Sequence, residues 1–295
     1  MDPRIIVTLE EVSGDLKEEI AETEDVEPLW SADIFSMIVI EPESVPEEVA
    51  CKVEAIDGVE HAVIERTGEQ NEMRKIEDTD KVHIEPEFDK FAETERLLEE
   101  LSEVSETIED SHISGVSETK FDRQRMAVID SGIDIRNAQI TNVVSRINLT
   151  EDDTLDSIGH GTAMACILNM QRPYMELFDM KVFDGYEVRE SNIIKALALS
   201  TDPSRDIFGV SLSLGLEPRE GYCPLCDATN KTAHAGVVVS VSSGELAKPI
   251  PRDVPPMCPA RAEKAIAVTA DSDKYTNDWF ADGDVVGKAD WTAYE

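Results

Sequence analysis

The sequence predicts an α/β fold: a doubly wound parallel sheet in the second half of the chain, preceded by a small α+β domain. Apolar runs alternate with helix-like segments from Arg125 to about residue 270, which is typical of such a sheet. The runs are apolar on both faces, as strands covered by helices on each side must be. Ligands bind beyond the carboxyl ends of such strands, so a site is expected there.

Residues 1–70 are predicted to form the small α+β domain. They contain four apolar runs, "RIIVTL", "FSMIVI", "VPEEVACKVEAI" and "HAVIER". The second and fourth runs are predicted strands. Between them Val49, Val53 and Ile56 fall at helical spacing, so the third run is predicted to be a helix.

Residues 71–122 are predicted to be an acidic linker that contains one helix. The segment "FAETERLLEELSEVSETI" places four apolar side chains on one helical stripe: Leu97, Leu101, Val104 and Ile108. An amphipathic helix of this kind is expected to dock on a neighbouring domain.

Residues 123–295 are predicted to hold the parallel sheet. The expected strands are "MAVID", "LFDMKVF", "FGVSLSL", "GVVVSVS" and "AIAVTA". The expected helices are "HGTAMACIL", "SNIIKALALS" and "CDATNKTAHAG", the last closed by Gly236 in a helix C-cap position.

The charge of the chain excludes several classes of partner. Its 295 residues include 63 acidic and 27 basic side chains, a formal net charge of −36. Nucleic acid and anionic membranes are not expected to bind, because phosphate recognition relies on Lys and Arg. Self-repulsion of this size is relieved in molar salt, where the screening length falls to roughly 3 Å. The acidic excess continues past residue 150, which favours a halophilic protein over an acidic N-terminal half attached to an ordinary domain.

The N-terminus "MDPRIIVTLEE" has no secretory-signal pattern, and no apolar stretch approaches the length of a membrane helix. A cytoplasmic location is therefore expected. Five cysteines, an odd number, do not indicate a disulfide framework. Cys223 and Cys226 have metal-ligand spacing, with Cys258 as a candidate third member, but a zinc site normally needs four ligands and no second CxxC exists. The cysteines are therefore interpreted as buried or free thiols, and no metal site is predicted.

The strongest candidate site combines Asp130 and His160. Asp130 closes the first strand of the predicted sheet, and His160 follows 30 residues later, between two glycines at the start of a helix. In a catalytic triad a carboxylate fixes the tautomer of an imidazole, and the imidazole takes a proton from a hydroxyl. Asp130 and His160 are thus predicted to be the acid and base of such a site; the alternative is a folded scaffold in which they have no catalytic role.

Four blocks, "AVIDSGID", "GHGTAMA", "VSLSLG" and "GVVVSVSSGE", resemble in this order the subtilisin-like serine peptidases, over residues 125 to about 270. Residues 1–70 resemble, more loosely, the propeptide that folds with such enzymes and inhibits them. The resemblance implies an incomplete subtilisin-like sheet with a ferredoxin-like, propeptide-type N-terminal domain. It also implies that Asp130 and His160 are triad residues.

The resemblance further implies a groove for an extended peptide or protein substrate. Ser213, Leu214 and Gly215 would pair with the substrate as an edge strand. Residues Ser242, Ser243 and Gly244 would line the pocket for the side chain before the scissile bond. The N-terminal domain is the expected intramolecular occupant of this groove, and no cofactor is implied, although structural calcium is compatible with it.

Two positions depart from the family pattern. The triad spacing places the serine nucleophile roughly 157 residues after His160, near residue 317, and no "GTSMA"-like block follows His160 in these 295 residues. Glu245 stands where the family has an asparagine that donates to the oxyanion, a donor worth on the order of 10²–10³ in rate. The expectation is therefore a serine endopeptidase domain that is inactive as this chain. The alternative is a pseudo-peptidase that binds peptides or acts as an inhibitory module.

Overall fold

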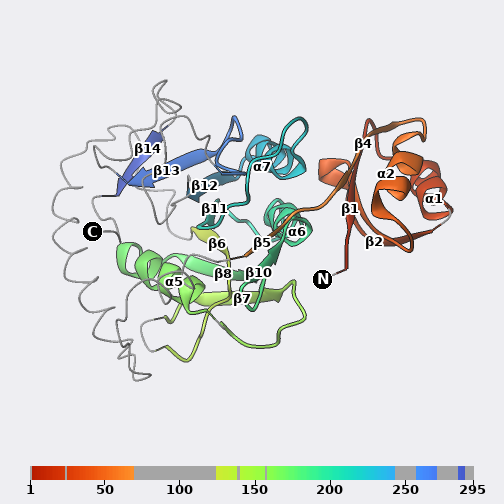
Figure 1. Ribbon diagram of the computed structural model, residues 1–295. Coiled ribbons are helices and arrows are strands. Elements are labelled where there is room, and N and C mark those ends of the chain that lie inside the picture. Colours follow the sequence, from red (N-terminus) through yellow and green to blue (C-terminus); the bar gives the residue numbers. More distant parts are fainter. Residues whose placement is uncertain are drawn as a thin grey trace, which may run out of the picture.

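The computed structural model of the chain describes residues 2–23, 25–69, 124–137, 140–156, 158–242, 257–270 and 285–289 (Figure 1). The predicted docking helix with Leu97, Leu101, Val104 and Ile108 lies outside the described residues, as do Ser243, Gly244 and Glu245.

The N-terminal domain, defined here as the unit from β1 to β4, is a four-stranded antiparallel sheet with two helices. Its elements in chain order are β1 (Ile5–Leu9), α1 (Gly14–Ala21), β2 (Val26–Ala32), the short 3-10 helix η1 (Asp33–Phe35), β3 (Met37–Pro42), α2 (Pro46–Glu54) and β4 (Val59–Ile64). The strand order is β2-β3-β1-β4, with β1 paired to both β3 and β4. This order, with a helix after β1 and another after β3, is the expected ferredoxin-like arrangement.

Three elements of this domain, α1, β2 and β1, were not predicted from the sequence, and for two of them the reason is identifiable. Helix α1 buries only Leu16 and Ile20, so its apolar stripe is too short to stand out. Strand β2 contains Pro28 and lies at the edge of the sheet, where a proline is tolerated and alternation is weak. The first apolar run, which was not predicted to be a strand, forms the fully buried β1.

A seven-stranded sheet, parallel at every pairing, forms the second part of the fold. Its strands are β6 (Arg125–Asp130), β7 (Val143–Asn148), β8 (Glu176–Lys181), β11 (Gly209–Leu212), β12 (Val238–Ser242), β13 (Ile266–Ala270) and β14 (Val285–Ala289). The helices are α5 (His160–Gln171), α6 (Glu190–Ser200) and α7 (Pro224–His234). The structure confirms the predicted α/β class and the five expected strands; it adds the edge strands β7 and β14.

The order of the large sheet, β14-β13-β12-β11-β6-β8-β7, places its switch point between β6 and β11. After β6 the chain forms the edge strand β7 and then returns to β8, which lies between β7 and β6; from β11 it builds outward through β12 and β13 to β14 on the other side. The crevice beyond the carboxyl ends of β6 and β11 is where such a sheet binds ligands. Asp130 ends β6, and the segment after Leu212 begins there.

The two parts of the fold share a hydrophobic core. One face of the N-terminal sheet packs on α6 and α7, next to which it lies in Figure 1. This shared core includes Ile6, Phe35, Met37 and Val39 from the N-terminal domain and Ile193, Leu197, Leu225 and Ala228 from the two helices. The other face of the N-terminal sheet is covered by α1 and α2, which form a separate cluster. Both faces of the N-terminal sheet are therefore buried, as expected when a small domain packs against the rest of the chain.

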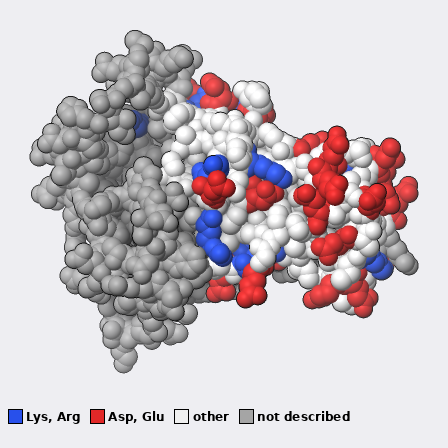
Figure 2. Space-filling model, turned by 90° about the horizontal axis from the view of Figure 1, so that it is seen from above, with Lys and Arg blue, Asp and Glu red and all other residues white. Residues whose placement is uncertain are grey.

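Among the described helices, none combines the length and apolar character needed to cross a membrane. Acidic side chains gather over the N-terminal domain on the face shown in Figure 2, with arginines and lysines more frequent next to it.

Candidate active site

The side chains of Asp130 and His160 are in direct contact. His160 Nδ1 lies 2.9 Å from Asp130 Oδ1 and 3.0 Å from Oδ2. Asp130 is 2 % exposed, whereas the imidazole is 21 % exposed. The carboxylate is thus buried against the ring while part of the ring faces solvent, as a proton acceptor for an incoming hydroxyl requires.

Close backbone approach explains the glycines around this pair. A Cβ at Gly161 would lie 2.2 Å from the Gly132 oxygen and 3.1 Å from Asp130 Cβ. Gly132 itself has φ +103°, and a Cβ there would lie 2.1 Å from the Leu155 oxygen. The end of β6 and the start of α5 therefore meet at a distance that only glycine permits.

Asp156 positions the start of α5, and the sequence analysis missed it. Gly159 occupies the N-cap with φ 89° and offers no side chain, so the first helical N–H groups need another acceptor. Asp156 accepts from Gly159 N at 2.8 Å and Thr162 N at 2.9 Å, and from the Thr162 hydroxyl. The sequence feature that could have identified Asp156 is its position three residues before the glycine at the start of the predicted helix.

Ser131 ties this helix start to the end of β6. Its hydroxyl donates to Asp156 Oδ1 at 2.8 Å and accepts from Gly161 N at 3.0 Å. Its backbone N–H donates to Asp130 Oδ1 at 2.7 Å. The orientation of the Asp130 carboxylate is therefore fixed from two sides, by a backbone N–H and by the imidazole.

Lys181, at the end of β8, holds the loop that leads to His160. Its ammonium group is 1 % exposed and donates to Asp152 Oδ2 at 2.8 Å, Asp152 O at 3.0 Å and Thr154 O at 2.9 Å. These donated hydrogen bonds keep the pKa of Asp152 far below its ordinary value. A buried ammonium satisfied in this way fixes the loop against the sheet.

The predicted substrate-binding residues that the structure describes lie after β11 and β12. Ser213, Leu214 and Gly215 follow β11 outside any helix or strand, and Leu216 then forms an isolated antiparallel bridge with Cys258. Ser242 is the last residue of β12. No hydrogen-bonded partner strand for residues 213–215 is recorded in the described part of the chain, so their pairing with a peptide remains a prediction.

A second, three-stranded sheet lies near this segment. Strand β10 (Glu187–Arg189) pairs antiparallel with β9 (Phe183–Asp184) on one side and with β5 (Thr67–Glu69) on the other. Gly68 of β5 also faces Gly215 and Leu216: a Cβ there would lie 2.5 Å from Leu216 Cδ2 and 3.9 Å from Gly215 O. An extended strand that follows the N-terminal domain therefore lies between β10 and the 215–216 segment.

Buried carboxylates anchor this strand. Glu190, which is 0 % exposed, accepts hydrogen bonds from the Arg66 backbone N–H at 3.0 Å, from the Arg66 guanidinium and from Arg219 Nη2 at 2.7 Å. Glu65, also buried, accepts from Arg189 Nη1 at 2.6 Å and from Ser191 N at 3.2 Å. The residues just before β5 are thus joined to the start of α6 by paired charges.

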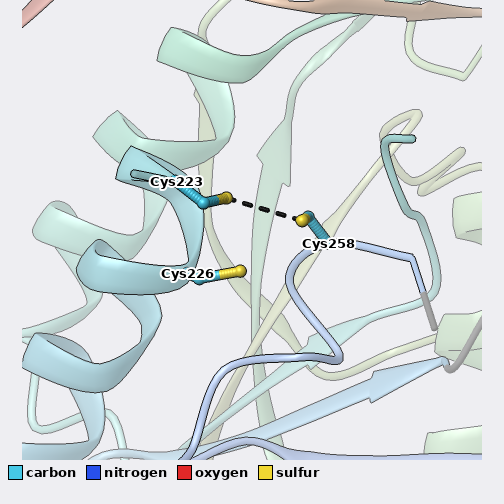
Figure 3. A group of neighbouring side chains, drawn as sticks. All are labelled: Cys223, Cys226 and Cys258. Atoms are coloured by element: carbon cyan, nitrogen blue, oxygen red, sulfur yellow. Dashed lines mark hydrogen bonds between the residues drawn. The ribbon is translucent and has the colours of Figure 1, made fainter. Parts of the chain in front are cut away.

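Three cysteines meet beside Arg66. Cys223 precedes α7, Cys226 lies in its first turn and Cys258 faces them from the segment before β13 (Figure 3). Hydrogen bonds from the neighbouring thiols, together with Arg66, hold the pKa of Cys258 well below its usual range, whereas that of Cys226 is raised by its hydrogen bonds to the other two. The sequence spacing identified Cys223 and Cys226 and left Cys258 as a candidate third member; in the fold, Cys258 lies next to both of them.

A buried carboxylate in contact with an imidazole, as for Asp130 and His160 at the switch point of this sheet, is the arrangement that two members of an Asp-His-Ser triad adopt. A family model described as the Subtilase family, Peptidase S8, matches residues 122–285, more than half of the chain. The chain therefore belongs to the subtilase family.

Solved structures with a similar fold include proteases with little sequence identity. The epidermin leader peptide processing serine protease of Staphylococcus aureus is 13 % identical with a TM-score of 0.58, covering 92 % of this chain and 70 % of that chain. Fervidolysin of Fervidobacterium pennivorans, a keratinolytic enzyme related to subtilisin, is 16 % identical with a TM-score of 0.55, covering 92 % and 43 %.

A lanthipeptide protease matches at 23 % identity with a TM-score of 0.43, covering 50 % of this chain and 48 % of its own. The matches to this protease and to fervidolysin thus span less than half of those chains. A comparison with curated proteins gives no match.

Proposed function

We propose that the protein is a subtilisin-like serine endopeptidase in which Asp130 and His160 activate a serine hydroxyl for attack on a peptide bond. The observation that carries this proposal is the contact of 2.9 Å between His160 Nδ1 and Asp130 Oδ1 at the switch point of the sheet. In this arrangement Asp130 holds the imidazole with Nε2 directed away from the carboxylate. His160 then takes the serine proton and returns it to the leaving amine.

We further propose that the N-terminal domain acts as an intramolecular inhibitor, with β5 in the substrate groove. Its support is the pairing of β5 with β10, the approach of Gly68 to Gly215 and Leu216, and the core shared with α6 and α7. A substrate peptide that adds a strand between β10 and the 213–215 segment would compete for the same place. The matches that cover 92 % of the chain extend over this N-terminal region as well.

Fluorophosphonate labelling tests the peptidase proposal. The expected serine position near residue 317 lies outside these 295 residues, so the assay compares the chain alone with a preparation that also supplies a serine-bearing segment. We expect labelling and peptide hydrolysis only in the second preparation, and loss of both in its His160→Ala variant. Labelling that survives this substitution would overturn the proposed role of His160.

The variant Gly68→Leu tests the inhibitor proposal. Its side chain would displace Leu216, so we expect faster hydrolysis of an added peptide in the serine-containing preparation. Gly14→Ala, where an added Cβ has nothing within 4 Å, is the matched control. Unchanged turnover in Gly68→Leu, with β5 shown by hydrogen exchange to be released, would contradict occupancy of the groove.

A second candidate function is a pseudo-peptidase that binds or inhibits without cleaving. The observation that favours it is Glu245 at the oxyanion position, because an ionised carboxylate cannot donate a hydrogen bond to the oxyanion. Peptide binding without turnover in the serine-containing preparation, combined with turnover after Glu245→Asn, would support this candidate over an active wild-type enzyme.

We also propose, from the net charge of −36, that the protein is adapted to concentrated salt. Repulsion among its carboxylates is screened over a few ångströms in molar salt. Cooperative thermal unfolding is therefore expected in molar potassium chloride and not in dilute buffer. A sharp melting transition in dilute buffer would contradict this adaptation.

A further inference from the structure

The three cysteines near Arg66 form a compact group of sulfur atoms. The Sγ atoms of Cys223, Cys226 and Cys258 all lie within 4.8 Å of one another, and those of Cys223 and Cys258 are 3.4 Å apart. Figure 3 shows the side chains of Cys223 and Cys226 directed toward Cys258. Within the described ranges, this is the one group of three or more metal-ligating side chains that meets so closely.

The backbone holds the three sulfurs in place from two sides. Cys223 and Cys226 are spaced by one turn at the start of α7, where Pro224 fixes the first helical position. Cys258 is held opposite them by two backbone hydrogen bonds with Leu216, of 2.8 and 2.9 Å. The site is therefore preorganised by a helix start and a β-bridge.

We propose that Cys223, Cys226 and Cys258 bind Zn²⁺ as three thiolates, with the fourth coordination position taken by water or another added ligand. Zn–S bonds of about 2.3 Å in a tetrahedron place the sulfurs about 3.8 Å apart. The observed separations, from 3.4 Å to at most 4.8 Å, bracket this value, so small side-chain rotations complete the site. The expectation of no metal site rested on the lack of a fourth protein ligand and of a second CxxC, although Cys258 was a candidate third member.

Charge and geometry favour a metal over a disulfide. Three thiolates and Zn²⁺ carry a net charge of −1, and Arg66 supplies the compensating charge: its Nη2 donates to Cys223 Sγ at 3.2 Å. A disulfide needs two sulfurs at about 2.05 Å and would leave the third cysteine as a thiol in contact with it. A trigonal set of soft ligands beside one guanidinium suits a thiophilic cation.

This site would join α7 to the segment that follows Ser213, Leu214 and Gly215, since Cys258 bridges Leu216 directly. Zinc bound there would stiffen one wall of the proposed groove. The inference stands on the cysteine geometry alone and does not depend on whether the protein cleaves peptides.

Metal titration of the full 295-residue chain, purified reduced and metal-free in folding salt, tests the proposal. We expect one equivalent of Zn²⁺ by competition with a chromophoric chelator. With Co²⁺ we expect sulfur-to-cobalt charge transfer and the intense visible bands of tetrahedral coordination. Single substitutions Cys223→Ser, Cys226→Ser and Cys258→Ser should each weaken zinc binding at least about 100-fold, since even partners of ligands contribute 10–100-fold.

Matched control variants distinguish zinc binding at this site from zinc binding to any accessible thiol. Cys51→Ser changes an exposed cysteine of α2 and should leave zinc affinity unchanged. Arg66→Gln and Arg219→Gln each remove one guanidinium from Glu190, but only Arg66 contacts Cys223. Arg66→Gln should therefore weaken zinc binding about tenfold, and Arg219→Gln should not.

Three results would overturn the proposal. One is the absence of stoichiometric zinc binding by the folded wild-type chain, checked by circular dichroism. Another is a cobalt spectrum without sulfur charge transfer. The third is zinc affinity that is unchanged in all three folded serine variants. An intact mass two hydrogens below the reduced value, in protein isolated without added oxidant, would assign the cluster to a disulfide instead.

Discussion

Asp130 and Glu190 are both buried carboxylates at the ends of secondary-structure elements, yet their partners differ. Asp130, at the end of β6, accepts from one backbone N–H and contacts one imidazole that is 21 % exposed. Glu190, at the start of α6, accepts from two guanidinium groups and a backbone N–H. The first carboxylate faces a group that can change its protonation state, and the second faces permanent charges.

Under the proposed peptidase function, this difference in partners distinguishes a reactive site from a structural one. Arginine keeps its charge at any ordinary pH, so the Glu190 cluster is a fixed clamp between β5 and α6. An imidazole gains charge only when it takes a proton, so in the proposed reaction the Asp130 carboxylate would stabilise a charge that forms during the reaction. Under this proposal the same type of acid serves docking in one region and chemistry in the other.

The largest expected effect comes from removing the charge of Asp130. In the serine-containing preparation, Asp130→Asn should lower kcat about 10⁴-fold, because the amide leaves the imidazole in the wrong tautomer. Peptide hydrolysis at saturating substrate is the measurement. Asp153→Asn, an equal change of charge on an exposed residue of the loop before α5, is the control and should stay close to wild type. Similar kcat values for the two variants would place the chemistry elsewhere.

Glu190→Gln should have the next largest effect, on docking. Breaking a buried ion pair costs about 3–5 kcal/mol, since Arg66 and Arg219 lose their shared partner. Amide hydrogen exchange in β5 should then accelerate by about 10²-fold or more. Glu187→Gln, on the exposed side of β10, provides the comparison and should exchange like wild type. Slow exchange in Glu190→Gln would show that β5 is held by the shared core alone.

Gly161→Ala should have a smaller effect, on stability. Its Cβ would meet the Gly132 oxygen at 2.2 Å, so the start of α5 must move away from β6 at a cost of about 1–3 kcal/mol. The midpoint of urea unfolding measures this loss. Gly14→Ala, at the open first position of α1, should change the midpoint little, and equal midpoints for the two variants would contradict the close approach.

The sequence was sufficient for the five inner strands of the large sheet and for bringing Asp130 and His160 to the same edge of it. Buried parallel strands are continuous apolar runs, so β6, β8, β11, β12 and β13 were recognisable by composition alone. A carboxylate at the end of one such run and a histidine at the start of the next helix are brought to the same edge by the topology itself. In this region the local hydrophobic pattern of the sequence therefore predicts the same strands that the folded sheet contains.

The ion pairs of Glu190 with Arg66 and Arg219, and the group of three cysteines, could not be predicted from the sequence in this way. Arg66 and Glu190 are 124 residues apart, and neither lies in a motif whose spacing implies the other. The approach of Cys258 to Cys223 depends on the Leu216 bridge, which is tertiary. Edge strand β7 alternates between half-buried and exposed residues, so it lacks the apolar run that marked its neighbours.

Asp179 is another buried carboxylate, and it has a single guanidinium partner. It is 1 % exposed and lies 2.8 Å from Arg146 Nε. Burial raises its pKa to about 6, and the ion pair with Arg146 opposes this only in part. At this position one arginine therefore does not fully offset the desolvation of the carboxylate.

The sign of the pH dependence follows from this pKa. Between the unfolded value of about 3.9 and about 6, the folded protein binds more protons at Asp179 than the unfolded chain does. This group therefore stabilises the fold at low pH, and its contribution falls by up to about 1.4 kcal/mol per pH unit as the pH rises through that window. Asp179→Asn, which stays neutral, should remove this component.

The measurement is the difference in unfolding free energy between wild type and Asp179→Asn from pH 4 to pH 7. The other carboxylates contribute equally to both proteins and cancel in the difference. Relative to wild type, the variant should gain stability as the pH rises and level off above about pH 6. Asp153→Asn supplies the same change of charge at an exposed position and should give a flat difference. A flat difference for Asp179→Asn as well would mean that Arg146 fully compensates the buried charge of Asp179.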